Sequence, residues 1–275
     1  MEPAGSQKAA YFNGSFPHSD LCFLLDSPQM EEFTLIDYSV TILDLWPLQS
    51  LQYLRVLHLE GIEITAEGKK AVPGLVAALL RLEVLDLEAC SLDTEIYAQL
   101  LGICLNSVVM HRFSYLHNEV LTEGMRFPEI PLRGAVRDLR LTAHCQSSEF
   151  ALTRIVLSVP LLTELRLDCS CLNHFASKCL VEAFGSLTSL QGLSLRGVVM
   201  RKRSWRDVLN GLKQAIYLQD LTLDYTKVGD KELPFLVGSL CRLQWVHRTS
   251  LSHCRLTEEG KTYISQLVHR VEVLF

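Results

Sequence analysis

The stretch Leu190-Gln-Gly-Leu193-Ser-Leu195 decides the fold, because its pattern L-x-x-L-x-L returns along the chain at a nearly fixed spacing. In all, nine copies follow one another at steps of 24 to 28 residues, beginning at Met30, Leu54, Leu82, Met110, Val136, Leu162, Leu190, Leu218 and Val246. A fixed period of this size is typical of a solenoid, in which each repeat buries its apolar face only against its neighbours.

Positions one, four, six and eleven of the repeat are the apolar ones. They hold apolar side chains in 34 of 36 cases in a chain that is 48% hydrophobic, so coincidence would satisfy only about half of them. The two exceptions are Thr249 at position four and Gln146 at position eleven. The repeat is therefore a real property of the sequence.

Each repeat predicts one short strand and one helix. Positions three to seven alternate between core and solvent, which predicts strands centred near residues 33, 57, 85, 113, 139, 165, 193, 221 and 249. Helical spacing follows, as in 71–82, 178–190 and 205–218. Strand and helix alternating in so short a unit predict an α/β fold with one parallel sheet. Because helices are wider than strands, we expect a horseshoe with the sheet on its concave face and the helices on its convex face.

The repeat resembles the ribonuclease-inhibitor type of leucine-rich repeat. It is likewise similar to the leucine-rich-repeat domain of NLR immune receptors, which has repeats of this type. The stretch Leu251-Ser-His-Cys254-Arg-Leu256-Thr257-Glu-Glu-Gly260 carries the resemblance best. A polar or thiol side chain is expected at position nine to bond the turn backbone. Side chains of this kind stand there in five repeats, as Cys90, Asn118, Ser170, Thr226 and Cys254. His144 is a further candidate, whereas Tyr38, Ile62 and Val198 do not fit.

The repeat sets the expected domain organisation. Residues 30–275 are expected to form one leucine-rich-repeat domain of about nine units, with an unfinished tenth beginning at Val271. Residues 1–29 are expected to form an N-terminal extension, in which 20–25 cap the first repeat. Between 121 and 136 the helix gives way to a segment with Pro128 and Pro131, which predicts an irregular connection.

Composition bears on compartment and partners. A net charge of −5 and a pI near 6.0 give no reason to expect nucleic acid or an acidic membrane as a partner. The chain shows neither a signal peptide nor an apolar run long enough to span a bilayer. Its nine cysteines are odd in number and scattered, which is typical of reduced thiols. These features predict a cytoplasmic protein, with the nucleus as the alternative.

Motifs that could carry chemistry are few. Gly260-Lys261-Thr262 ends like a phosphate-binding loop, but Arg255 stands where its first glycine belongs, so no nucleotide site is expected. Cys145 and Cys171 share position ten of adjacent repeats and suit either a metal or redox pair or two turn-lining thiols, and we favour the thiols. No nucleophile, base and orienting acid come together on the repeat, so neither an enzyme nor a cofactor is expected.

The one dense basic run, 200–206, is expected on a loop that enters a helix, with Trp205 packed beneath it. A solvated loop is the favoured interpretation of this run. Recognition of phosphate or nucleic acid, or nuclear import, is the alternative that its charge leaves open.

The concave face is the expected binding surface. Arg140 and Arg166 share position five in consecutive repeats, so their guanidinium groups should stand side by side between acidic rows. Such a charged face is either a soluble surface with weak internal ion pairs or a protein-binding surface, which we favour. The candidate partner-binding residues are Glu60, Asp86, Glu88, Asp138, Arg140, Glu164, Arg166, Asp168, Arg196, Asp220, Asp224, Tyr225 and Arg248.

These features favour a non-catalytic module that binds another protein on its concave face, and the resemblance implies an NLR-like sensing or inhibitory role. The alternative is the substrate-recognition subunit of a ubiquitin ligase. An F-box needs about 40 residues, and only about 29 precede the first repeat, which disfavours that alternative without removing a shorter adaptor helix at 19–30.

Overall fold

The computed structural model describes residues 8–14, 21–37, 42–90, 92–117, 134–142, 144–145, 156 and 159–275. The chain divides into two compact units. Unit 1 comprises 1–121 and 125–136, and unit 2 comprises 122–124 and 137–275.

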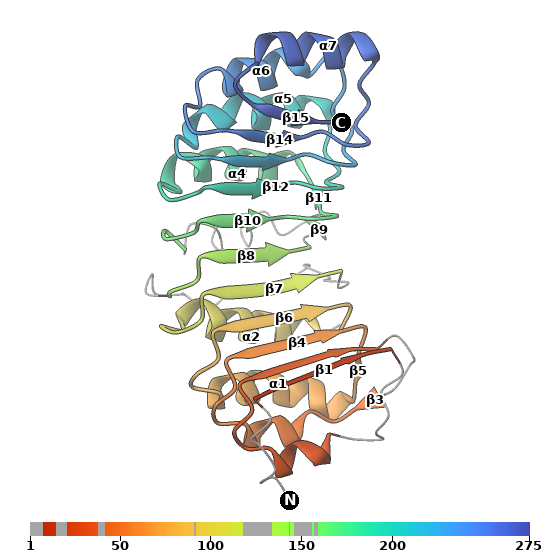
Figure 1. The fold of residues 1–275 in the computed structure, drawn as a ribbon, viewed down its shortest axis with the longest axis vertical. Coiled ribbons are helices and arrows are strands. Elements are labelled where there is room, and N and C mark those ends of the chain that lie inside the picture. Colours follow the sequence, from red (N-terminus) through yellow and green to blue (C-terminus); the bar gives the residue numbers. More distant parts are fainter. Residues whose placement is uncertain are drawn as a thin grey trace, which may run out of the picture. The chain divides into compact units, whose positions relative to one another are not determined.

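Unit 1 is built on five parallel strands. In sheet order these are β1 (Ala9–Asn13), β2 (Glu32–Ile36), β4 (Val56–Glu60), β6 (Val84–Glu88) and β7 (Arg112–Leu116). A second, two-stranded sheet joins β3 (Ile42–Leu43) to β5 (Glu63–Ile64). The helical layer contains the 3-10 helices η1 (Cys22–Asp26) and η2 (Trp46–Ser50) and the α-helices α1 (Ala66–Ala78) and α2 (Thr94–Asn106). Figure 1 shows α1 and α2 on one side of the sheet.

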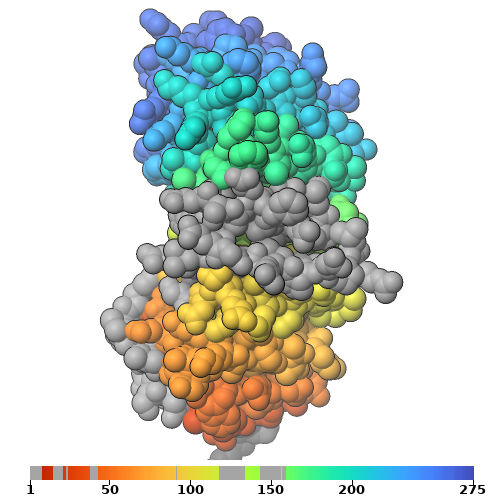
Figure 2. All heavy atoms as spheres, turned by 180° about the vertical axis from the view of Figure 1, so that it is seen from behind, coloured from red at the N-terminus to blue at the C-terminus, as the bar shows by residue number. Residues whose placement is uncertain are grey.

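Unit 2 repeats this plan with six parallel strands. In order these are β8 (Asp138–Leu141), β10 (Glu164–Arg166), β12 (Gly192–Ser194), β13 (Asp220–Thr222), β14 (Arg248–Ser250) and β15 (Glu272–Leu274). A short pair joins β9 (His144–Cys145) to β11 (Cys171–Leu172). The helices described are α4 (His174–Ser186), α5 (Lys202–Gly211), η3 (Leu212–Gln214), α6 (Leu233–Leu240) and α7 (Glu258–Leu267). Figure 2 draws all heavy atoms as spheres, coloured by residue number.

The nine strands expected from the repeat are all present in parallel sheets, which confirms the α/β leucine-rich-repeat solenoid. The strands pair position by position, so that Leu165, Leu193 and Leu221 lie side by side in the core. Side chains at position four are almost fully buried throughout, including Thr249 at 0% exposure. The helices at 66–78, 174–186 and 202–211 begin a few residues earlier than their apolar spacing predicts.

A left-handed turn follows the strands at position eight of the repeat. The backbone φ angle is positive at Ala89, His117, Cys169, Tyr225 and His253, and at Gly61 and Gly197. The position-nine side chains then bond this turn as expected. Cys90 Sγ donates to the carbonyl of Leu59 at 3.3 Å, and Cys254 Sγ to that of Leu223 at 3.2 Å.

The ends of the repeat array carry additional strands. Strand β1 lies in the stretch expected to be an extension and pairs in register with β2, from Ala9 opposite Glu32 to Asn13 opposite Ile36. Leu21 and Leu24 are fully buried in the segment expected to act as a cap. At the other end, β15 pairs with β14 where the tenth repeat begins.

One expectation from the sequence is wrong. The basic run is the first turn of α5 rather than a loop, with Arg201 at the N-cap, although Trp205 is buried beneath it at 1% exposure. In the β9–β11 pair Cys171 lies opposite His144 and Cys145 lies opposite Leu172, so the two cysteines are on adjacent strands and offset by one residue. The irregular connection at 121–136 and Gln146 lie outside the described residues, except for 134–136.

Candidate functional site

The candidate site is the outer face of the sheet, which we define as the face carrying positions three, five and seven, opposite the helices. Twelve of the thirteen candidate residues hold these positions, and Tyr225 follows at position eight. In unit 1 they are Glu60, Asp86 and Glu88. In unit 2 they are Asp138, Arg140, Glu164, Arg166, Asp168, Arg196, Asp220, Asp224, Tyr225 and Arg248.

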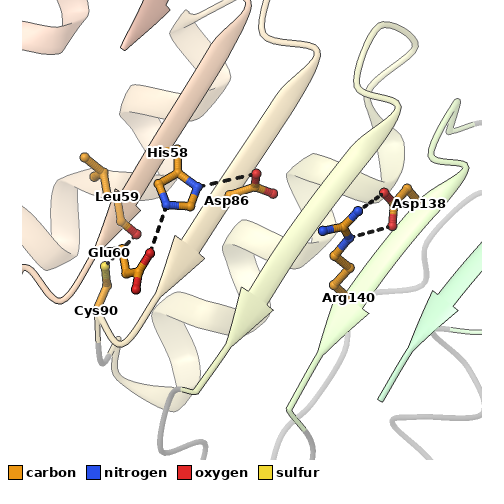
Figure 3. A network of polar contacts seen from close by, with 7 residues as sticks. All are labelled: His58, Leu59, Glu60, Asp86, Cys90, Asp138 and Arg140. Carbon is orange, nitrogen blue, oxygen red and sulfur yellow. Dashed lines mark hydrogen bonds and ion pairs between the residues drawn. The ribbon is translucent and has the colours of Figure 1, made fainter. Parts of the chain in front are cut away.

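The first two candidate arginines of unit 2 are held by carboxylates of the same repeat. Arg140 and Arg166 lie opposite each other in the sheet, as expected. Arg140 forms a bidentate ion pair with Asp138, with 2.9 Å from Nε to Oδ1 and 2.8 Å from Nη2 to Oδ2 (Figure 3). Arg166 Nη2 lies 2.7 Å from Asp168 Oδ2. Both guanidinium charges are therefore already neutralised within the protein.

Arg196 differs from these two arginines, because both neighbouring position-seven carboxylates are engaged by other donors. Asp168 accepts from Arg166 and from Ser194 Oγ at 2.7 Å. Asp224 Oδ1 accepts from Ser250 Oγ at 2.5 Å and from the backbone N–H of Ser252 at 2.9 Å. Among the described residues, Arg196 has no ion pair.

Arg196 instead heads a column of three stacked side chains. Its guanidinium lies 5.0 Å from the ring centre of Tyr225. The Tyr225 ring in turn stacks on His253, at 4.4 Å between centres and 19° between planes. Tyr225 and His253 both occupy position eight, so their left-handed turns place the two rings one strand apart. Tyr225 is 52% exposed, so the column presents the edge of an aromatic ring beside a cation.

A groove of about 380 Å³ runs beside this column. Gly192 lies in its lining at position three, where a Cβ atom would overlap the carboxylate of Glu164. Burial raises the pKa of Glu164, and the neighbouring carboxylates Asp138 and Asp220 raise it further. The groove is lined by Glu164, Arg166, Gly192, Leu193, Ser194, Arg196, Asp220, Thr222 and Asp224.

The remaining unit 2 candidate lies at the rim of the outer face. Arg248 Nε is 3.9 Å from Asp220 Oδ1 and 3.6 Å from Glu272 Oε2. All three side chains are about half exposed or more, so these contacts stabilise the fold little.

In unit 1 the outer face is acidic and holds a histidine that the sequence analysis missed. His58 Nε2 lies 3.4 Å from Glu60 Oε2, and His58 Nδ1 lies 3.6 Å from Asp86 Oδ2 (Figure 3). These contacts raise the pKa of His58, the bond to Asp86 most strongly. The pKa of Glu88 is also raised, first by burial and then by Glu60. The position of His58 in the repeat, at position five directly beside Asp86, was a signal that could have found it.

Two further features of the sequence can be checked in the described part of the chain. No group of three His, Cys, Asp or Glu side chains there could hold a metal ion. The Gly260 amide donates to the capping Thr257 hydroxyl at 3.1 Å, so this turn is an ordinary helix start. Within the same residues, no helix is long and apolar enough to cross a membrane.

Comparisons with known proteins add little to this site. No family model matches the sequence. A search of curated proteins gives no match either. Among solved structures, one match is the crystal structure of an internalin (inlF) from Listeria monocytogenes, with 16% identity and a TM-score of 0.48. The match covers 93% of this chain and 70% of that chain. A likeness of this size says nothing about what the chain binds.

Proposed function

We propose that the chain is a non-catalytic protein–protein interaction module that binds a partner protein on the outer face of its sheet. In unit 2 the anchor is the column of Arg196, Tyr225 and His253. Because the repeat type resembles that of NLR receptors, we further propose a sensing or inhibitory role in the cytoplasm or nucleus.

The proposal rests on the surroundings of the Arg196 side chain. Its side chain stands on an exposed face beside two carboxylates that other donors already satisfy, and it stacks on an exposed tyrosine. Arginine and tyrosine are the side chains that most often dominate the binding energy of protein interfaces. A carboxylate on the partner can pair with the guanidinium while an apolar group packs against the exposed edge of the Tyr225 ring.

The groove beside the column supports the same function. Its floor carries the hydroxyl groups of Ser194 and Thr222, and its walls carry charges of both signs. Such a lining offers hydrogen bonds and charge complementarity that select one partner over another. It holds no arrangement of groups that would activate a nucleophile or a water molecule, which favours binding over catalysis.

The test is a quantitative affinity purification from cells with the wild-type chain, with Arg196→Ala/Tyr225→Ala, and with Arg203→Ala as the control. Arg203 is an exposed cation of similar size in the first turn of α5, on the helical side. We expect the double variant to lose its specific partner more than tenfold, since truncating such an anchor commonly costs about 2 kcal/mol or more. The control should retain the partner. If Arg203→Ala loses the partner and the double variant retains it, the partner binds on the helical side, and the proposal is rejected.

A further inference from the structure

The groove on the outer face of unit 2 follows a single strand, β12. The outward side chains of this strand at positions three and five are small, because they belong to Gly192 and Ser194. The walls are the side chains at the same positions of the two neighbouring strands, namely Glu164, Arg166, Asp220 and Thr222. A low strand between two higher ones gives an open channel that runs along β12, from position three toward Arg196 at position seven.

The dimensions of this channel favour one kind of occupant. Neighbouring strands are about 4.8 Å apart, so the strands that carry the two walls, β10 and β13, are about 10 Å apart. An α-helix with its side chains is about 10–12 Å wide and cannot enter, whereas an extended chain can. Positions three and seven are about 13 Å apart, which is the distance between residues i and i+4 of an extended segment. These two residues of such a segment face the same side.

The end of the groove at position three is negatively charged. The Glu164 carboxylate lies in the space that a Cβ atom on Gly192 would fill, and its side chain is exposed. Within the described residues it accepts no hydrogen bond, and Arg140 and Arg166 attract it only at longer range, because each is paired with an aspartate. Asp220 stands on the opposite wall, and its two cationic neighbours are 3.7 and 3.9 Å away. A cation from outside can therefore pair with Glu164 here.

The other end of the groove is positively charged. Arg196 is exposed at position seven and has no ion pair with any residue that the structure describes. Asp224, which also lines this end, already accepts hydrogen bonds from Ser250 and Ser252. An anion from outside can therefore pair with the Arg196 guanidinium. The two ends of one groove thus match charges of opposite sign, separated by the length of a short extended segment.

We propose that this groove binds an extended segment of the partner protein that carries a basic side chain and, four residues away, an acidic side chain. The basic side chain pairs with Glu164 beside Asp220, and the acidic side chain pairs with Arg196. The residue midway between them faces Ser194 on the floor of the groove. The inference deepens the proposed function by naming the chemistry of the partner at this site, and it rests on that function.

The test titrates blocked pentapeptides into the full-length protein and follows the backbone amide signals of β10, β12 and β13 in NMR spectra. One peptide has lysine first, serine third and aspartate last, with alanine between them, and a second has the reverse order. We expect at least one order to cause saturable shifts at Gly192, Ser194 and Arg196. Replacing the lysine of that peptide with glutamine, or its aspartate with asparagine, should each weaken binding about fivefold, the upper end for one exposed ion pair.

Variants of the protein assign each charge to its end of the groove. In Glu164→Gln/Asp220→Asn, loss of the peptide's lysine should no longer matter, while loss of its aspartate should still weaken binding. Arg196→Gln should show the reverse, because a double-mutant cycle isolates the pairwise interaction. The matched control is Glu182→Gln/Glu259→Gln, which removes two charges from exposed positions on α4 and α7. It should change the affinity by less than about twofold, because distant exposed charges are screened.

Three outcomes would overturn the inference. The first is the absence of shifts in β10, β12 and β13 with either order of the peptide. The second is a loss of the lysine that weakens binding equally in the wild type and in Glu164→Gln/Asp220→Asn. The third is equal weakening by this variant and by the control, because it would mean that overall charge attracts the peptide.

The same variants separate this inference from the proposed function. If partner capture depends on Arg196 and Tyr225 but is unchanged in Glu164→Gln/Asp220→Asn, the proposed function stands and the bipolar segment is rejected. If the peptides show the expected couplings but Arg196→Ala/Tyr225→Ala retains the captured partner, the groove binds such a segment and the proposed function is rejected.

Discussion

Arg166 and Asp168 form an ion pair along one strand end, with 2.7 Å between Nη2 and Oδ2. The Asp168 side chain is only 5% exposed, while that of Arg166 is 34% exposed. The arginine therefore shields a nearly buried carboxylate, and its role is at least partly structural. The sequence placed Arg166 beside Arg140 on this face, and the structure adds its ion pair with Asp168.

Arg166→Ala should destabilise the protein by about 1–3 kcal/mol, because a buried carboxylate loses its charged donor and keeps only Ser194. Arg196→Ala removes no such partner and should change the free energy of unfolding by less than about 0.5 kcal/mol. Urea denaturation of both variants measures the difference. Equal stability of the two would show that Arg166 is dispensable to the fold.

Ala89→Gly should stabilise the protein by roughly 0.5–1 kcal/mol. Ala89 has a φ of +51°, a left-handed conformation that glycine adopts without the steric cost of a Cβ atom. Gly197→Ala is the reverse change at the same repeat position, at a φ of +66°, where the new Cβ would also lie 3.3 Å from Cys169 Sγ. It should lower the melting temperature. Shifts of the same sign in both variants would contradict the argument.

The fold follows from the sequence because positions one, four and six contribute to the core in almost every repeat. One apolar period therefore specifies strand, helix and register together. Strand β1 was missed because Ala10 is small and Gln7 occupies position one, so the copy lacks the leucines that mark the others. The pattern also could not tell a loop from a helix start at Arg201, since exposed basic residues suit both.

The sequence predicted where the candidate residues lie but not which side chains they contact. The positions of Arg140, Arg166 and Arg196 in the repeat place them on one face. Each guanidinium can nevertheless reach carboxylates on its own strand or on the next. Which contact forms depends on side-chain conformations and on competing donors such as Ser194 and Ser250. The column of Tyr225 and His253 likewise depends on the left-handed turn at position eight, which the apolar pattern does not contain.

Thiol reactivity should follow burial. Burial raises the pKa of Cys90 from 9.0 to about 12, which lowers its thiolate fraction roughly a thousandfold. Cys104 is fully buried, and its pKa is raised for the same reason. Cys169 and Cys241 are exposed and should react first with iodoacetamide at neutral pH. Mass spectrometry of the native protein over time gives the order, and early labelling of Cys90 would mean that its repeat opens readily.

Glu88→Gln should raise stability at neutral pH by about 0.5 kcal/mol, the scale of a half-exposed charge interaction. The pKa of Glu88 in the folded protein is raised above 4.5, so its ionised form is unfavourable there, and its stabilising contribution is lost as pH rises through that pKa. The gain in the variant should therefore vanish toward pH 4. Glu83→Gln is the control with the opposite sign, because the pair with Arg55 lowers the pKa of Glu83. Thermal unfolding between pH 4 and 8 measures both.

Gly192→Ala should abolish much of the partner binding while leaving the fold intact. The new Cβ overlaps the Glu164 carboxylate and forces this partly exposed side chain to move across the groove. Alanine is otherwise well tolerated at a strand position, so the melting temperature should stay within about 2 °C of the wild type. Gly238→Ala, on α6 with no atom near the added Cβ, is the matched control and should leave partner binding unchanged. Calorimetric titration of the purified partner into each variant gives the affinities. If Gly192→Ala binds as tightly as the wild type, the partner does not enter the groove, and only the column beside it can serve as the anchor.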